Sequence, residues 1–158
     1  MAAYRFLSTW LLEAPREEVF ELLWDSERWP RWWPGVESVE KLESGDEEGR
    51  GSLGRYVWKS GLPYRVEFDA RITAVERPSY LEGRVAGDLE GVGRFRLLAG
   101  DGGLTAVLYD WDVRTTATWM RALTPLLRPV FVRSHDAVMR SGGEGLARAL
   151  GAPLVARS

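Results

Sequence analysis

The clearest pattern in the chain is an alternation of apolar and charged residues in its middle part. From residue 64 to residue 73 every second position is apolar and the positions between them are polar or charged. A period of two places alternate side chains on opposite faces of a strand. Because one face is apolar and the other is polar and suited to solvent, the pattern predicts an antiparallel sheet with one buried face.

Further strand-like runs surround this segment and are separated by turn signals such as Arg77-Pro78-Ser79 and Gly87-Asp88. Consecutive strands joined by short turns predict a meander of hairpins. The spacing of residues 36–42 fits a helix or a strand, and we assign a strand. The acidic segment 44–51 is predicted to be a turn. Strands are expected at residues 4–12, 36–42, 64–73, 80–86, 89–98 and 104–116.

Two short helical segments are expected after the first strand. Pro15 is followed by acidic residues and by an apolar spacing of three and four, which is typical of a first helical turn. Residues 29–35 carry three tryptophans and two prolines, which indicates a single turn that packs indoles into the body.

Residues 118–150 predict one long amphipathic helix that ends at Gly151 and Pro153. Pro125 and Pro129 fall on its polar side, so a kink or break is expected in its first part. The apolar arc is assigned to Trp119, Leu123, Leu126, Leu127, Val130, Phe131, Ser134, Ala137, Val138, Ser141 and Gly145.

Length and composition fit one globular domain over residues 1–158. The chain has no cysteine and a single histidine, His135, so we expect no disulfide, no metal site and no cofactor. No stretch suits a secretory signal or a transmembrane segment, which makes the cytoplasm the default location. Residues 114–158 hold 7 of the 21 basic and 2 of the 23 acidic side chains, but these arginines are scattered, so nucleic acid is not an expected partner.

The order of these elements resembles the START-related superfamily (SRPBCC), and within it the bacterial polyketide cyclase/dehydrase and lipid-transport group. The resemblance spans nearly the whole chain and rests on residues 14–20, Trp29-x-x-Trp32-x-Pro34-x-Val36, Leu62-Pro63-Tyr64, and His135-Asp136-x-Val138-Met139 with residues 142–146. It implies an α+β helix-grip fold, in which a curved antiparallel sheet of about six or seven strands wraps a long C-terminal helix. It also implies a single START-like ligand-binding domain with a cavity between sheet and helix, but no particular reaction.

The strand phase then selects candidate cavity walls, because large aromatic side chains on the concave face enclose an apolar ligand and offer it a hydroxyl or indole N–H. An ordinary packed core is the alternative for the same positions. The expected ligand-binding residues are Trp58, Tyr64, Phe68, Tyr109 and Trp111, followed by Tyr56, Phe95, Trp119, Leu123 and Leu127.

Other notable residues receive structural assignments. The tryptophans at 24, 29, 32 and 33 are expected to pack the short helices on the sheet, with a ligand cage or a membrane-docking patch as alternatives. His135 is expected to be a helix residue at the margin of the apolar arc, and no catalytic residue is assigned. Asp110 and Asp112 should face solvent, unless the strand phase is shifted by one residue. Gly91 and Gly93 are expected to mark a bulge or to leave room for a ligand.

Three functions fit these expectations. The first is the binding, carriage or sensing of a hydrophobic or aromatic small molecule, which we favour over the others. The second is a cyclase or dehydratase, which needs an ionisable side chain beside the cavity. The third is a protein- or membrane-interaction module with a filled core. The sequence specifies neither the ligand nor the oligomeric state.

Overall fold

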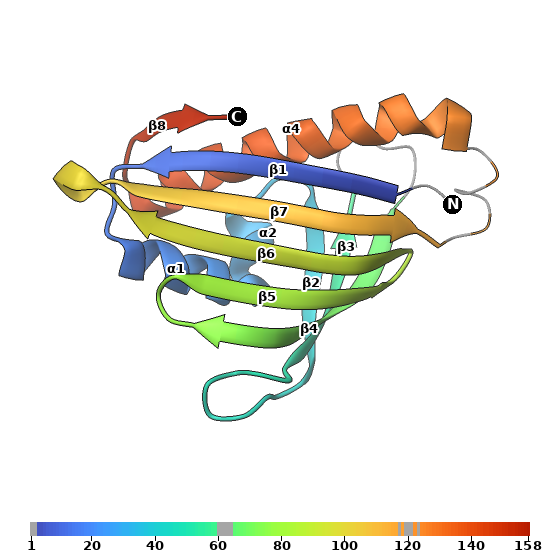
Figure 1. Ribbon diagram of the computed structural model, residues 1–158, viewed down its shortest axis with the longest axis horizontal. Coiled ribbons are helices and arrows are strands. Elements are labelled where there is room, and N and C mark those ends of the chain that lie inside the picture. The colour runs from blue at the N-terminus through green and yellow to red at the C-terminus, as the bar shows by residue number, and fades with distance from the viewer. Residues whose placement is uncertain (1–2, 60–64, 117, 119–121, 123) are drawn as a thin grey trace.

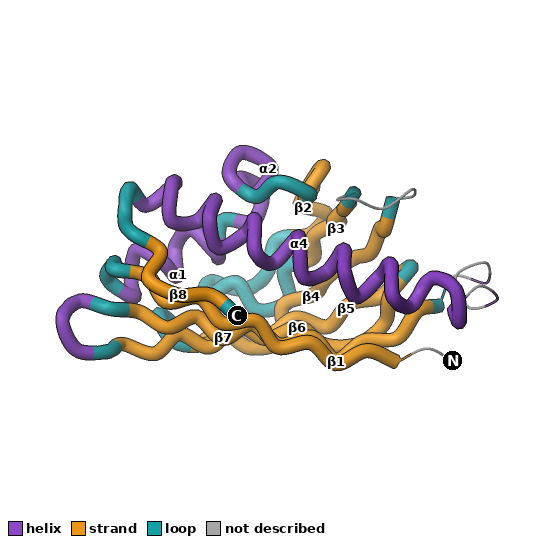
Figure 2. The backbone as a smooth tube through the Cα atoms, turned by 90° about the horizontal axis from the view of Figure 1, so that it is seen from above, coloured by secondary structure: helices purple, strands orange, loops and turns teal. Residues whose placement is uncertain are grey.

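A computed structural model describes residues 3–59, 65–116, 118, 122 and 124–158. One antiparallel sheet of eight strands has the order β2-β3-β4-β5-β6-β7-β1-β8, and it curls around a long C-terminal helix and shorter helices (Figures 1 and 2). The strands are β1 (Ala3–Leu12), β2 (Val36–Glu43), β3 (Leu53–Trp58), β4 (Val66–Glu76), β5 (Tyr80–Gly87), β6 (Leu89–Ala99), β7 (Thr105–Thr115) and β8 (Leu154–Arg157). The α+β helix-grip fold expected from the sequence is confirmed.

The alternation in the sequence becomes the two faces of this sheet. In β7, Val107, Tyr109, Trp111 and Val113 are buried and point to the concave side, while the residues between them are more exposed. In β4 the same phase holds for Val66 and Phe68. A register shift between Ile72 and Ala74 then changes it, so that Val75 is the next buried residue. A bulge of this kind bends a strand and re-aims its side chains.

Three short helical elements follow β1 and lie against the concave side of the sheet (Figure 1). They are α1 (Arg16–Trp24), a 3-10 turn η1 (Ser26–Arg28) and α2 (Trp29–Trp32). A further 3-10 turn, η2 (Asp101–Gly103), joins β6 to β7. In α1 the buried side chains are Val19, Phe20 and Leu23, at the spacing of one helical face.

The long helix α4 (Thr124–Leu150) is fastened to the rest of the molecule by two indole groups. Trp10 Nε1 on β1 donates to the Met139 carbonyl at 3.0 Å, and Trp33 Nε1 after α2 donates to the Val138 carbonyl at 2.8 Å. A run of glycines makes room for the rings, because a Cβ on Gly143 would lie 2.7 Å from Trp10 and a Cβ on Gly145 would overlap the Trp32 carbonyl oxygen. These residues fix where α4 crosses the sheet.

The buried side of α4 differs from the predicted arc. Leu126 is 74% exposed, and Val130 and Ala137 are also exposed. Phe131, Ser134, Val138 and Gly145 of the predicted arc are buried as expected. The helix also buries residues outside the arc, namely Met139, Gly142, Gly143, Leu146 and Ala147. The predicted arc contains Gly145 but not Gly142 and Gly143, because close approach rather than side-chain area decides the contact at these two glycines. Pro129 lies inside the helix, while Pro125 follows its first residue, and a proline beside the N-terminus is tolerated.

Eight strands are found where about six or seven were expected; β3 was not among the expected ranges, and neither was β8. This strand has only four residues, follows Pro153, and pairs with β1 at the edge of the sheet. The pairing extends to Ser158, which exchanges two backbone hydrogen bonds of 2.9 Å with Thr9. Such a short segment carries too little periodicity to be recognised in a sequence.

Gly145→Ala should test the notch between α4 and Trp32. Alanine normally stabilises a helix relative to glycine by up to about 1 kcal/mol, but here its methyl group would overlap backbone. We expect the free energy of unfolding to fall by about 2–3 kcal/mol, as for an overpacked core. Urea denaturation followed by circular dichroism measures it. Arg140→Ala, at an exposed position of the same helix, is the control and should change stability by less than about 0.5 kcal/mol. A stabilised Gly145→Ala protein would contradict the proposed packing.

Candidate functional site: a divided cavity on the concave face

The concave side of the sheet encloses a hollow of about 490 Å³. Its walls come from β2 to β7, from the α1–η1–α2 segment, and from the loop 44–52 between β2 and β3. Exposed residues of η1 and of this loop surround its open side. The volume is within the range of about 300–1,000 Å³ that is usual for pockets of small organic ligands.

Six aromatic residues expected from the strand phase line this hollow. Each is at most 8% exposed, and their rings form a continuous surface. Phe95 and Tyr109 stack with centroids 3.7 Å apart, Tyr56 and Phe68 stack at 5.6 Å, and Phe68 meets Trp111 edge to face at 5.5 Å. The six are Tyr56, Trp58, Phe68, Phe95, Tyr109 and Trp111.

The remaining expected wall residues are not placed by the structure. Tyr64, Trp119 and Leu123 lie outside the described residues, and so does the side chain of Leu127. No described residue of α4 lines the large hollow. The main cavity was expected between the sheet and the C-terminal helix, and this position is corrected. The large hollow lies between the sheet and the short helices with the β2–β3 loop. The reason is that the glycine notch sets α4 against β1 and α2.

A second, narrow hollow of about 70 Å³ does lie under α4. It is lined by Phe6 and other apolar residues of the sheet and by His135, Val138 and Met139 of the helix. Trp58, Phe68 and Trp111 line both hollows. These three rings therefore form a partition between a wide open chamber and a small apolar one.

His135 is not the marginal helix residue that the sequence suggested. Its side chain is 13% exposed and stacks on Phe6 with ring centroids 3.7 Å apart. In the described part of the chain neither ring nitrogen has a hydrogen-bond partner, and the nearest carboxylate oxygen, of Asp136, is 3.9 Å from Nδ1. Burial lowers the pKa of His135 to about 4, so the imidazole is neutral at pH 7.

The partition also contains unused hydrogen-bond donors. Among the described residues the indole N–H groups of Trp58 and Trp111 have no acceptor in hydrogen-bonding geometry, although the Tyr109 hydroxyl lies near Trp111. Tyr56 donates to Ser26 Oγ at 2.8 Å. Burial raises the pKa of both Tyr56 and Tyr109, so each phenol keeps its proton at neutral pH. The chamber therefore offers neutral donors to a ligand.

Two further groups of residues line the large hollow: tryptophans for which packing was favoured over a ligand cage, and glycines, of which Gly83 was missed. Trp24 and Trp29 line the large hollow, while Trp32 and Trp33 belong to the packing around α4. Gly83 and Gly93 are paired across β5 and β6 and leave the centre of the concave wall without side chains. Gly93 was expected to leave room for a ligand. Gly83 could have been recognised in the same way, because it is a glycine at an inward-facing position of β5. Gly91 has a different role, because its Cβ would overlap β7 backbone.

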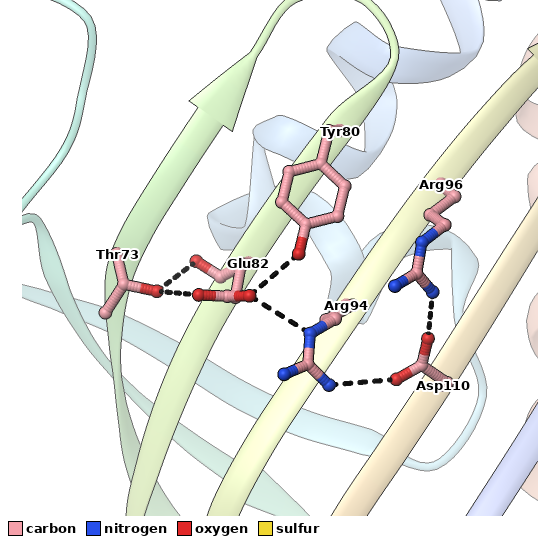
Figure 3. A network of polar contacts seen from close by, with 6 residues as sticks. All are labelled: Thr73, Tyr80, Glu82, Arg94, Arg96 and Asp110. Carbon is pink, nitrogen blue, oxygen red and sulfur yellow. Dashed lines mark hydrogen bonds and ion pairs between the residues drawn. The ribbon is translucent and has the colours of Figure 1, made fainter.

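Asp110 and Asp112 face away from the cavity, as expected. Asp110 pairs with Arg94 and Arg96 on the convex face, in a network that continues through Glu82 to Tyr80 and Thr73 (Figure 3). Hydrogen bonds from Tyr80 and Thr73 lower the pKa of Glu82 and keep it ionised. Asp112 lies 3.8 Å from Arg5. Neither aspartate is placed to act as an acid or base in the cavity.

Carboxylates surround the open side of the large hollow. We call this group the acidic rim: Glu21, Asp25, Glu27, Asp46, Glu47 and Glu48. Two cations, Lys41 and Arg77, line the hollow with them. Among the described residues, no group of three or more histidine or carboxylate side chains is arranged to hold a metal ion.

Solved structures with the same architecture come from several kingdoms. They include the aromatase/cyclase ZhuI from Streptomyces sp. R1128 (20% identity, TM-score 0.72, covering 94% of this chain and 96% of that one) and a START superfamily protein from Mycobacterium smegmatis (15%, 0.75, 93% and 97%). A major latex-like protein from Panax ginseng follows (10%, 0.70, 94% and 97%). At these identities the likeness concerns the fold alone.

No curated protein matches the chain. Within the described residues, no helix has the length and apolar character needed to cross a membrane. Residues 12–141 match the family described as polyketide cyclase/dehydrase and lipid transport. Since this match covers most of the chain and the solved structures share its START-like fold, the protein belongs to the polyketide cyclase/dehydrase and lipid transport family.

Proposed function

We propose that this protein binds, and thereby carries or senses, a hydrophobic or aromatic small molecule in the large hollow. The observation that carries the proposal is a chamber of about 490 Å³ whose walls are aromatic and whose centre is kept open by two paired glycines. Such a chamber differs from the filled core that a protein- or membrane-interaction module of this fold requires. Rigid aromatic walls bind apolar molecules with little loss of side-chain entropy.

The expected affinity follows from the area that a small aromatic ligand can bury. About 300 Å² of apolar surface is worth about 7 kcal/mol at about 25 cal/mol per Å². Polar contacts add to this binding free energy and the loss of entropy on association subtracts from it, so the dissociation constant should be about 1 μM. The neutral fluorophore N-phenyl-1-naphthylamine is a suitable probe.

Gly83→Leu should remove binding by filling the chamber. A Cβ at Gly83 would make only ordinary contacts, the nearest being 3.7 Å from the Arg71 carbonyl oxygen, so the fold should tolerate the leucine. We expect the affinity for N-phenyl-1-naphthylamine, measured by fluorescence titration, to fall at least about tenfold, as for a ligand that loses about 1.4 kcal/mol. Ala86→Leu, at an exposed position of the same strand, should bind like the parent protein. Equal binding by all three proteins would place the probe elsewhere and contradict the proposal.

A second candidate function is an enzyme of the cyclase or dehydratase type, and one observation favours it. His135 is neutral, is buried beside the narrow chamber, and has no hydrogen-bond partner among the described residues. An imidazole that is neutral at pH 7 and has an uncommitted nitrogen can accept a proton from a carbon next to a carbonyl group, and a pKa of about 4 makes it a weak base in this role. The partition rings separate it from the large hollow, so a substrate would have to pass Trp58 and Trp111.

The ionisation of His135 can be measured directly, because it is the only histidine in the chain. Its imidazole signals in NMR should titrate near pH 4. A histidine whose pKa is lower in the folded than in the unfolded state stabilises the fold above the unfolded pKa of about 6.5, and this stability is lost as the pH falls toward 4. Between pH 7 and pH 4.5 the parent should therefore lose about 2–3 kcal/mol more unfolding free energy than His135→Phe. Parallel pH profiles for the two proteins would refute the buried environment.

The enzyme candidate has its own test. Proton exchange at the central carbon of 1-phenylbutane-1,3-dione in D₂O reports general-base catalysis and is followed by NMR. If His135 acts as a base, the parent protein should accelerate the exchange at least about tenfold relative to His135→Gln, which is less than the usual range of about 10²–10⁴ because a pKa of about 4 makes the imidazole a weak base. Equal rates for the two proteins would leave the carrier as the supported function.

A further inference from the structure

The charge around the large hollow restricts which aromatic ligands fit it. Six carboxylates and two cations line the hollow. Both cations are already paired, Arg77 with Glu21 and Lys41 with Glu27 at 3.9 Å. Asp25 pairs with Arg28 at 3.0 Å. Asp46 and Glu48 share the nearby Arg50, and Glu47 has no ion pair among the described residues. The open side of the chamber is therefore net negative, with no free basic group for an anionic ligand.

The rim already binds one cation against an aromatic ring. The guanidinium of Arg77 lies 4.8 Å from the ring centroid of Trp24 and 5.2 Å from that of Phe20, while it pairs with Glu21. Aromatic faces and carboxylates together are the usual surroundings of a bound organic cation. Trp24 and Trp29 continue this aromatic surface into the chamber.

A second observation, independent of the rim, points to a ligand in the same chamber. Trp58 is 8% exposed, lines the chamber, and has an indole N–H without an acceptor among the described residues. Buried donors are normally paired. An uncharged oxygen on the ligand, such as a ketone, would supply the missing acceptor at the inner end.

We propose that the chamber takes an aromatic organic cation, whose ammonium group stays at the acidic rim while its apolar body lies against the tryptophan walls and an uncharged oxygen accepts from Trp58. This inference rests on the proposed function and narrows its ligand class. Carboxylates of the same size and shape, including fatty-acid-like molecules, should bind more weakly because the rim repels them.

Three ligands on one scaffold test the role of charge. They are 2-acetylnaphthalenes that carry trimethylammoniomethyl, hydroxymethyl or carboxymethyl at position 6, and their affinities are measured by isothermal titration calorimetry. In about 0.01 M salt, where charges interact over about 30 Å, the ammonium ligand should bind about tenfold more tightly than the carboxylate, with the alcohol between them. In about 1 M salt, where that distance is about 3 Å, the ratio should fall below about threefold.

Two triple variants test whether the rim carboxylates cause the preference for the ammonium ligand. The triple variant Glu27→Gln, Glu47→Gln, Glu48→Gln removes half of the rim, and its ratio of ammonium to carboxylate affinity should fall at least about threefold. The control triple, Glu40→Gln, Glu67→Gln, Glu90→Gln, removes three exposed carboxylates that do not line the hollow and should keep the ratio. A carboxylate that binds as tightly as the ammonium ligand, or a ratio unchanged by the rim triple, would overturn the inference.

A separate pair of ligands tests the hydrogen bond from Trp58 to the ligand oxygen. Replacing the acetyl group of the ammonium ligand by ethyl should weaken binding about fivefold in the parent protein and have no effect in Trp58→Phe. Equal affinities of the two ligands for the parent would overturn the contact with Trp58. If none of the ligands binds, the proposed function fails together with the inference, whereas binding without charge preference refutes only the inference.

Discussion

Everything on the concave face depends on where α4 crosses the sheet, and two indole groups and three glycines decide this. Trp10 and Trp33 donate to adjacent carbonyls of the helix, and Gly142, Gly143 and Gly145 allow the rings and the Trp32 backbone to come close. A helix held this tightly at β1 and α2 cannot also cover β4 and β5. The opposite part of the concave face is left to the short helices and a loop, and that is where the large hollow lies.

The tryptophans are consequently divided between two tasks. Trp10, Trp32 and Trp33 fill the junction with α4, where their rings are almost completely buried. Trp24, Trp29, Trp58 and Trp111 line the hollow. An unfilled volume of this size costs packing energy, and the paired Gly83 and Gly93 maintain it rather than reduce it. A fold selected for stability alone would have larger side chains at these two positions.

The sequence predicts the sheet walls well because a period of two fixes the face of every residue in a strand. Tyr56, Phe68, Phe95, Tyr109 and Trp111 follow from phase alone. Helical periodicity is less informative. It finds Phe131 and Val138 on the buried face of α4, but it misses Gly142 and Gly143, which carry no hydrophobic signal, and it includes Leu126, which is exposed. The environment of His135 depends on contact with Phe6, far away in the sequence. Local patterns contain no information about such a contact.

Charge is arranged differently on the two sides of the sheet, and this difference bears on specificity. On the convex face Glu82 and Asp110 are matched by Arg94 and Arg96, so solvent meets a nearly neutral network. At the rim the carboxylates outnumber the cations that line the same hollow. Because exposed ion pairs contribute little to stability, the excess is not explained by folding. Asp46 and Glu48 share one arginine and Glu47 has no ion pair among the described residues, so the rim keeps a net negative charge. A net charge beside an aromatic chamber affects which molecules approach it.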